Sequence, residues 1–518
     1  MRLRLAAAGI VAALLYRYAL PPEALNALGW LALLPLFAAV ERWAPCGRVA
    51  GRWLGLPFGL VFGFATFHWL TALSPAADMT QPWLLWPGLV FFVLYLSLYP
   101  WLFFRVYAGL RRRSPWALLL APPLWTSLEW LRGSGVLAFS WVHLSQTQAV
   151  GGLLAPAGWV GGLGLGFLMV GAQAGAAALL VGRGAARRVG AGLLGGAALV
   201  LALACIPSQR AGDATVTVAA LQGNVALADK WDPRFRMENL RIYHELGEQA
   251  VERGARLLVW PETAFPVSLF YDRHAERALR RTALELGADL ITGYQGLSPR
   301  GEGGYAYRNA AVLVAANGAL EGAYSKVKLL PFGEEIPLAD LLAPGLDIDL
   351  GQSNFTPGPG VRVLEGGALR CGIFICYEMG FAASARRAAA DGAELLVNIS
   401  NDGWFATPLA LELHAALSPM RAAENGLPVL RCGNNGVTEI LDARGHLLGR
   451  LATDTRDLLV ATLPRPARAS FYARHGGWAT PLAWGLYSLV SLLSYWRKKS
   501  GTATVSATGG ARFDHSAS

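Results

Sequence analysis

A cysteine at the end of an apolar stretch is the first residue in this sequence whose type and setting suggest chemistry. Cys376 lies in FICYEMG, residues 374–380, between two β-favouring residues and a tyrosine, Glu378 and a glycine turn. A thiol becomes a good nucleophile only after it loses its proton, and a structural cysteine needs no carboxylate two residues further on. The stretch therefore indicates a nucleophile. Cys371 and Cys432 are assigned to the core, the usual place of a lone cysteine on an apolar strand.

Two other segments place reactive side chains just after apolar runs. VWPETAFP carries Glu262, and YSKVKLLPFGEEIP carries Lys326 and Lys328. A carboxylate can take the thiol proton, and an ammonium group can stabilise the oxyanion that forms when the sulfur attacks an ester or amide carbonyl. Each residue has an ordinary alternative, because Glu262 suits a surface loop and either lysine suits a solvated face. The two lysines are two residues apart and share one face of a strand, so spacing alone does not choose between them.

The elements that must position these side chains lie between residues 208 and 475. Apolar, β-favouring stretches there alternate with stretches of helical periodicity. Strands are expected at 215–225, 256–260, 289–296 and 393–400, a hairpin at 361–378, and helices at 235–253 and 273–288. This alternation predicts a layered α/β domain, and the ends of its strands are where a rigid sheet presents catalytic groups.

The composition places another large part of the chain in a membrane. Of the 518 residues, 54% are hydrophobic and 15% are charged, which is too apolar for an ordinary soluble enzyme. Only four acidic residues precede position 208, and the other 31 of the 35 follow it. The formal net charge is +10, but many of the basic residues lie in short loops between apolar runs. That placement favours a membrane topology over a nucleic-acid surface.

Eight apolar segments approach or reach the roughly 20 residues that cross a bilayer. They are 5–20, 24–41, 53–75, 83–110, 115–133, 157–182, 188–207 and 477–495. With the N-terminus in the cytoplasm, every inner loop carries arginine or lysine, whereas the outer loop at 74–82 carries neither. We therefore expect a transmembrane bundle of about seven spans over 1–207, an outward-facing catalytic domain over 208–475, a last span over 476–499 and a disordered cytoplasmic tail over 500–518.

Four motifs, taken together and in this order, resemble a known family. WPETAFP, KVKLLPFGEEIP, ICYE and NISNDGWF are similar to the motifs of the nitrilase (carbon–nitrogen hydrolase) superfamily. With apolar spans on both sides, the resemblance narrows to the bacterial apolipoprotein N-acyltransferases and covers nearly the whole chain. It implies a multi-span α-helical membrane bundle that carries an α/β nitrilase-like α-β-β-α sandwich facing the periplasm.

The resemblance also implies roles for particular residues. It gives Glu262 as the base, Cys376 as the nucleophile and Lys326 as the lysine of a Glu-Lys-Cys triad, because Lys326 stands eight residues before the glutamate of PFGE. The supporting or substrate-binding residues that it implies are Glu334, Tyr377, Glu378, Trp231 in DKWDP, and Trp404 in SNDGWF. The chain departs from the family in one outer loop, 134–146, where Ser140 replaces the usual proline. Phe139 and Trp141 remain there and are expected as interfacial aromatic residues.

The function that these observations predict is acyl transfer in the bacterial inner membrane. A phospholipid would donate an acyl chain to Cys376, and the N-terminal amine of the diacylglyceryl-Cys of an apolipoprotein would accept it. The alternatives are a membrane-tethered amidase or nitrilase that hydrolyses small amides, and a non-enzymatic protein such as a transporter. Few intramembrane charges argue against a transporter. The sequence holds no CxxC and no nucleotide motif, so we expect no metal, cofactor or nucleic-acid partner, and a monomer.

Overall fold

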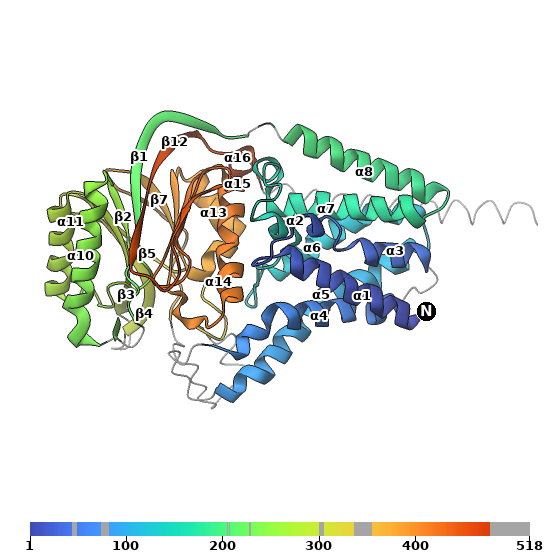
Figure 1. The fold of residues 1–518 in the computed structure, drawn as a ribbon, viewed down its shortest axis with the longest axis horizontal. Helices are drawn as coiled ribbons and strands as arrows, with labels where there is room; N and C mark the ends of the chain where they lie inside the picture. Colours follow the sequence, from blue (N-terminus) through green and yellow to red (C-terminus); the bar gives the residue numbers. More distant parts are fainter. Residues whose placement is uncertain are drawn as a thin grey trace, which may run out of the picture.

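The protein has a helical N-terminal part and a mixed α/β part that lies against it (Figure 1). The computed structural model describes residues 1–43, 49–73, 82–204, 206, 208–226, 229–230, 232–299, 305–335 and 355–476. The predicted last span at 476–499 falls outside these residues apart from its first position, and the predicted tail at 500–518 lies outside them entirely. Both remain predictions, as do the domain boundaries.

The N-terminal part is a bundle of apolar helices. Its longer helices are α1 (Arg2–Ala19), α3 (Leu34–Arg42), α4 (Leu56–Phe67), α5 (Leu85–Arg111), α6 (Ala121–Arg132), α7 (Ala157–Val181) and α8 (Ala185–Ala204). Within the described residues, four helical segments are long and apolar enough to cross a membrane, namely Gly51–Thr71, Pro82–Arg111, Ala157–Val181 and Ala185–Ala204. This confirms a multi-span membrane bundle, whereas the expected number of eight spans stays a prediction.

Small residues let the bundle pack closely around α7. A Cβ atom added at Gly175 would lie 2.7 Å from the carbonyl oxygen of Gly190 on α8, so the two helices touch through their backbones there. Near its start, α7 bends at Gly161, whose φ of 73° is outside the helical range. The bend lies where the helix meets the α/β part.

The α/β part contains two six-stranded sheets. The first has the strand order β12-β1-β2-β3-β4-β5 and the second has the order β11-β10-β9-β8-β7-β6. These orders include β1 (Arg210–Gln222), β3 (Asp289–Pro299), β6 (Val363–Glu365), β10 (Glu439–Leu441), β11 (Leu447–Arg450) and β12 (Asp457–Arg468). In each sheet two parallel pairings are flanked by antiparallel ones. The strands that matter most for the site are β2 (Leu257–Val259), β4 (Tyr305–Val314), β5 (Leu320–Ser325), β7 (Arg370–Ile375), β8 (Leu395–Ser400) and β9 (Val429–Gly433).

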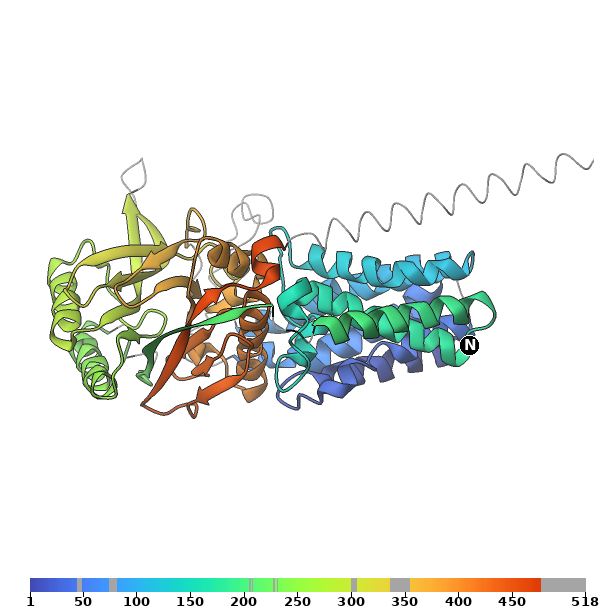
Figure 2. The ribbon, with the colours of Figure 1, turned by 90° about the horizontal axis from the view of Figure 1, so that it is seen from above.

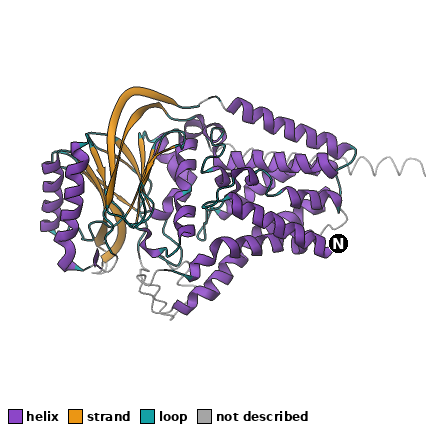
Figure 3. Ribbon diagram, viewed as in Figure 1, coloured by secondary structure: helices purple, strands orange, loops and turns teal. Residues whose placement is uncertain are grey.

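The two sheets pack face to face and a helical layer covers each outer face (Figures 1 and 2). Helices α10 (Arg236–Glu252) and α11 (Arg273–Leu286) cover the first sheet, while α13 (Ala382–Ala390), α14 (Pro408–Ala415) and α15 (Leu417–Asn425) lie on the second. The central strands are buried on both faces, which explains why they read as continuous apolar runs. The predicted α-β-β-α sandwich is therefore confirmed, and Figure 3 shows its second helical layer lying between the strands and the bundle.

Candidate active site

Cys376 sits in a sharp turn at the end of β7. The strand stops at Ile375, and residues Cys376–Gly380 form one short 3-10 turn. The φ angle of Cys376 is 53°, in the left-handed region that non-glycine residues rarely adopt and that is concentrated at functional sites. Cys376 is half-buried at the edge of the core between the sheets, whereas Cys371 and Cys432 are fully buried in it.

Glu378 fixes this turn to the segment that carries the lysines. Its Oε2 accepts a hydrogen bond from the backbone N–H of Ile375 at 2.9 Å. Its Oε1 accepts from the hydroxyl of Tyr324 and the backbone N–H of Val327, both at 2.7 Å, and from that of Lys328 at 3.0 Å. One buried carboxylate thus ties the end of β7 in the second sheet to the end of β5 in the first.

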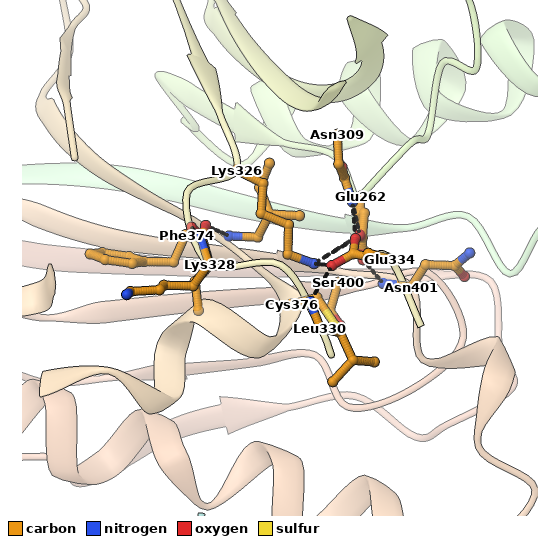
Figure 4. A network of polar contacts seen from close by, with 12 residues as sticks. Glu262, Asn309, Lys326, Lys328, Leu330, Glu334, Phe374, Cys376, Ser400 and Asn401 are labelled. Atoms are coloured by element: carbon orange, nitrogen blue, oxygen red, sulfur yellow. Dashed lines mark hydrogen bonds and ion pairs between the residues drawn. The ribbon is translucent and has the colours of Figure 1, made fainter. Parts of the chain in front are cut away.

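Lys326 follows β5 and is buried beside Glu334. Its Nζ lies 2.7 Å from Oε2 and 2.8 Å from Oε1 of Glu334, and 4.0 Å from Oε1 of Glu262 (Figure 4). Burial lowers the pKa of Lys326, but the charge and hydrogen bond of Glu334, together with the neighbouring Cys376 and Glu262, outweigh it, so the pKa lies well above its ordinary value. Lys326 is therefore a permanent cation at the site.

Glu262 lies in the loop after β2 and accepts hydrogen bonds on both oxygens. The Nδ2 group of Asn309 donates to Oε1 at 2.6 Å, and the backbone N–H of Asn401 donates to Oε2 at 2.8 Å. Burial raises the pKa of Glu262; the charge of Lys326 lowers it and that of Glu334 raises it, and the net shift is upward. A carboxylate with a raised pKa is a better proton acceptor than an ordinary one, which suits a general base.

The thiol of Cys376 is neutral at rest. Burial and the charge of Glu262 raise its pKa to about 12, although Lys326 lowers it. A neutral thiol requires a base at the moment of attack, and Glu262 can supply one. The arrangement of base, cation and thiol is therefore able to form and break a covalent acyl-thioester.

The other predicted residues lie at different distances from the cluster of Glu262, Lys326 and Cys376. Lys328 is exposed and points away from the cluster, with its Nζ 5.6 Å from the ring centre of Phe381, so geometry also separates it from Lys326. Tyr377 is buried and its hydroxyl donates to the carbonyl oxygen of Ala138 in the helical part. Trp404 lines a small cavity together with Glu262 and Asn309. Trp231 lies outside the described residues.

Three site residues were missed by the sequence reasoning. Asn309 on β4 bridges Glu262 and Glu334 through its Nδ2, which lies 2.6 Å and 3.0 Å from their Oε1 atoms. Lys230 is buried, and its Nζ donates to the backbone carbonyl of Glu262 at 2.7 Å; burial lowers its pKa to about 8. Asn401 contributes a backbone N–H. The sequence marked these three residues only as polar residues next to an apolar run or next to a recognised motif.

The aromatic residues of the loop at 134–146 lie between the two parts, and their expected place at the membrane interface stays a prediction. Trp141 is buried and stacks on His414 of the α/β part, with ring centroids 5.0 Å apart. Phe139 packs edge-on against Phe67 and Phe92 of the bundle. The loop thus lies in the contact between the two parts, where the turn that carries Cys376 contacts it through Tyr377.

Two family models match different parts of the chain. Residues 217–472 match the carbon–nitrogen hydrolase family model, and residues 12–175 match the model of the apolipoprotein N-acyltransferase N-terminal domain. Among solved structures, an amidase of the nitrilase superfamily from Nesterenkonia aligns with 24% identity and a TM-score of 0.38, over 48% of this chain and 90% of that one. The fold and the site define a carbon–nitrogen hydrolase domain joined to a membrane bundle.

Curated relatives narrow this class. Apolipoprotein N-acyltransferase from Geobacter metallireducens is 32% identical over 506 residues, which cover 94% of this chain and 95% of the relative. The protein of the same name from Azotobacter vinelandii is 35% identical over 419 residues, or 78% of this chain and 77% of the relative. The chain belongs to the apolipoprotein N-acyltransferase family. Within the described residues, no three His, Cys, Asp or Glu side chains are grouped as a metal site.

Proposed function

We propose that this protein moves a fatty acyl chain from a phospholipid to the N-terminal amine of the diacylglyceryl-Cys of an apolipoprotein, through a thioester on Cys376. The observation that carries the proposal is the buried cluster in which Lys326 lies within 4.0 Å of Glu262 and 2.7 Å of Glu334, beside a thiol that needs a base. The likeness to acyltransferases along 94% of the chain supports the same reaction.

The first half-reaction forms the thioester. The Sγ atom of Cys376 attacks the carbonyl carbon of the phospholipid ester while Glu262 takes the thiol proton. Lys326 stabilises the oxyanion of the tetrahedral intermediate. When the carbon–oxygen bond breaks, Glu262 returns the proton to the departing glycerol oxygen, and a lysophospholipid leaves.

The second half-reaction uses the same residues to transfer the acyl chain from Cys376 to the amine. The neutral amine of the apolipoprotein attacks the thioester carbon, and Lys326 again stabilises the oxyanion. Glu262 takes a proton from the attacking nitrogen and passes it to the departing sulfur. The products are an amide on the lipoprotein and the original thiol, so the cycle needs no further reactant.

The supporting residues have roles that follow from their contacts. Glu334 orients Lys326 and keeps it charged, and Glu378 holds the nucleophile turn against the lysine segment. Tyr377 anchors the turn to the helical part, and Trp404 forms a wall of the cavity beside Glu262. We assign Trp231 to the acyl site on its motif.

The membrane bundle has a physical purpose in this scheme. Both substrates carry acyl chains that are too apolar to leave the bilayer, so the catalytic domain must stay at the membrane surface. We propose that the protein is a monomer of the inner membrane, with both termini in the cytoplasm and the catalytic domain in the periplasm. The proposed division is 1–207 for the bundle, 208–475 for the catalytic domain, 476–499 for the last span and 500–518 for the tail.

Peptide mass spectrometry of the purified protein tests the proposal. The protein is incubated with a phospholipid and then with a diacylated lipopeptide. We expect the Cys376 peptide to gain one acyl chain and to lose it as the amine of the lipopeptide gains the same mass. Cys376→Ala should abolish the adduct, whereas the matched variant Cys432→Ala, in the core, should retain it. Release of the adduct by water alone would favour the amidase alternative, and no adduct from any phospholipid would refute the proposed donor.

A further inference from the structure

A fully buried arginine lies behind the nucleophile turn and takes no part in the proposed chemistry. Arg431 on β9 donates through Nη1 to Oδ1 of Asn398 at 2.5 Å and through Nη2 to Oδ2 of Asp402 at 2.8 Å. Its Nε donates to the carbonyl oxygen of Val437 at 3.2 Å, and its Nη2 lies 3.0 Å from Nδ1 of His414. The guanidinium group therefore joins β8, β9, α14 and the loop after β8.

Asn398 connects this arginine to the nucleophile. Its Nδ2 donates to the carbonyl oxygen of Phe374 at 3.3 Å and to that of Cys376 at 3.2 Å (Figure 4 includes Phe374 and Cys376). Because Arg431 holds the oxygen of the same amide, the amide cannot turn round without losing its bonds on both sides. The Asn398 amide thus stabilises the left-handed backbone at Cys376, a conformation that is disfavoured for a non-glycine residue.

The other side of the cluster faces the helical part. Asp402 receives a hydrogen bond from the hydroxyl of Ser400 at 2.6 Å and lies 3.1 Å from Nδ1 of His414. His414 is fully buried, with Trp141 stacked on it and Phe405 edge-on at 5.8 Å. The backbone of Trp141 is itself anchored, since its carbonyl oxygen accepts from Nη2 of Arg132 at the end of α6.

We propose that Asn398, Arg431, Asp402 and His414 form a positioning relay that couples the seating of Trp141, in the loop of the membrane part, to the orientation of Cys376. The inference rests on the proposed function only in taking Cys376 as the nucleophile. The relay residues contact one another and the backbone of the turn, so they are positioning residues. Together with the bond between Tyr377 and Ala138, the relay holds the turn to the bundle from two sides.

Two roles of Trp141, positioning the turn and lining a path for lipid, predict different effects of its removal. If Trp141 only lined a path for acyl chains, its removal would slow acylation by phospholipid and leave the thiol unchanged toward a small soluble reagent. If it positions the turn, its removal lets the thiol move away from its place beside Glu262 and Lys326. The charged groups that face Cys376 are Glu262, Lys326, Asp402 and Glu334. Displacement from them and from burial moves the titration of the thiol toward that of an ordinary cysteine.

The test compares acylation with alkylation in the full-length protein. Cys376 acylation by phospholipid and Cys376 alkylation by iodoacetamide at a series of pH values are both followed by peptide mass spectrometry in Trp141→Ala and in Asn398→Ala, which removes the amide without adding a charge. We expect acylation to fall roughly tenfold, as for the loss of one good hydrogen bond or ring contact, and the alkylation profile to shift to lower pH. Trp141→Phe keeps a ring on His414 and should behave as wild type, and Trp130→Ala, at an exposed position on α6, is the matched control.

Three results would overturn the relay. They are slower acylation with an unchanged alkylation profile, unchanged values in both measurements, and a Trp141→Phe variant as impaired as Trp141→Ala. Alkylation of Cys371 and Cys432, which are inaccessible in the folded protein, reports general unfolding. If Asn398→Ala unfolds, the pair of Trp141 variants still decides the question. Absence of acylation in wild type would refute the proposed function, whereas the alkylation profiles would still test the relay.

Discussion

The residues of the active site tune one another through charge. Glu262 is buried with the cation Lys326 at 4.0 Å and with a second carboxylate, Glu334, bound to that same cation. The second carboxylate therefore has two opposite effects, because it keeps Lys326 charged and also raises the pKa of Glu262. A base with a raised pKa accepts the proton of a poorly acidic thiol more readily.

This balance predicts a pH dependence for thioester formation. Glu262 must be unprotonated to act, so the rate should fall as the pH drops through its raised pKa, which lies above the ordinary value of a glutamate. Glu334→Gln removes one negative charge, lowers the pKa of Glu262 and should move this acidic limb to lower pH. The maximal rate should fall by roughly 10- to 100-fold, because a charged hydrogen bond to Lys326 is lost. Single-turnover acylation of Cys376 against pH measures both effects, and an unmoved limb would contradict the assignment.

At the residue scale, sequence reasoning reached the residues for which motif and chemistry coincide, and their catalytic roles stay predictions. Glu262, Lys326, Glu334 and Cys376 each follow or flank a strand in a recognisable motif, and the structure brings them together. Asn309 carried no such mark, because its importance comes from bridging two carboxylates that meet only in the folded chain. The structure supplies the physical reason for choosing Lys326 over Lys328, because Lys326 is the buried one of the two.

At the scale of elements, Glu378 is the connection between the two sheets at the site. The sequence predicted the hairpin of β6 (Val363–Glu365) and β7 correctly. It did not show that the carboxylate two residues after Cys376 would bind backbone N–H groups next to Lys326, since β5 and β7 belong to different sheets. Long-range pairings of this kind depend on how layers stack, which local periodicity does not encode.

Substitution of this carboxylate by an amide should therefore loosen the site. Glu378→Gln places an N–H₂ group opposite a backbone N–H and leaves a buried donor unsatisfied, which should lower the free energy of unfolding by roughly 2 kcal/mol. Acylation of Cys376 should fall in parallel. The matched control is Glu365→Gln on the neighbouring strand, an exposed partner of Arg370 at 2.8 Å, where little change is expected. Thermal unfolding in detergent measures the difference, and equal melting temperatures for the two variants would refute the role of Glu378.

At the scale of the whole molecule, the catalytic domain contacts the bundle at the backbone of Gly161 and Gly162, near the start of α7. The carboxylate of Glu424 on α15 accepts a hydrogen bond from the backbone N–H of Gly162 on α7 at 3.1 Å. The ring of Tyr472 in α16 (Phe471–His475) lies against Gly161, the residue at which α7 bends. The apolar core of the bundle accordingly continues without a break into α13 and α15. Sequence analysis predicted both parts but not this contact, because its surfaces come from segments more than 200 residues apart.

Substitution of Gly161 tests whether the contact between the catalytic domain and the start of α7 matters for catalysis. Its φ of 73° and ψ of 173° are accessible essentially to glycine alone, and a Cβ atom there would lie 2.3 Å from Cε2 of Tyr472. We expect Gly161→Ala to destabilise the protein by about 1–3 kcal/mol from backbone strain alone and to slow Cys376 acylation as the catalytic domain shifts on the bundle. Gly195→Ala on α8, where a Cβ atom would meet nothing within 4 Å, is the matched control and should keep wild-type melting temperature and activity. If the two alanine variants melt and acylate alike, the contact at the bend of α7 does not hold the catalytic domain in its working position.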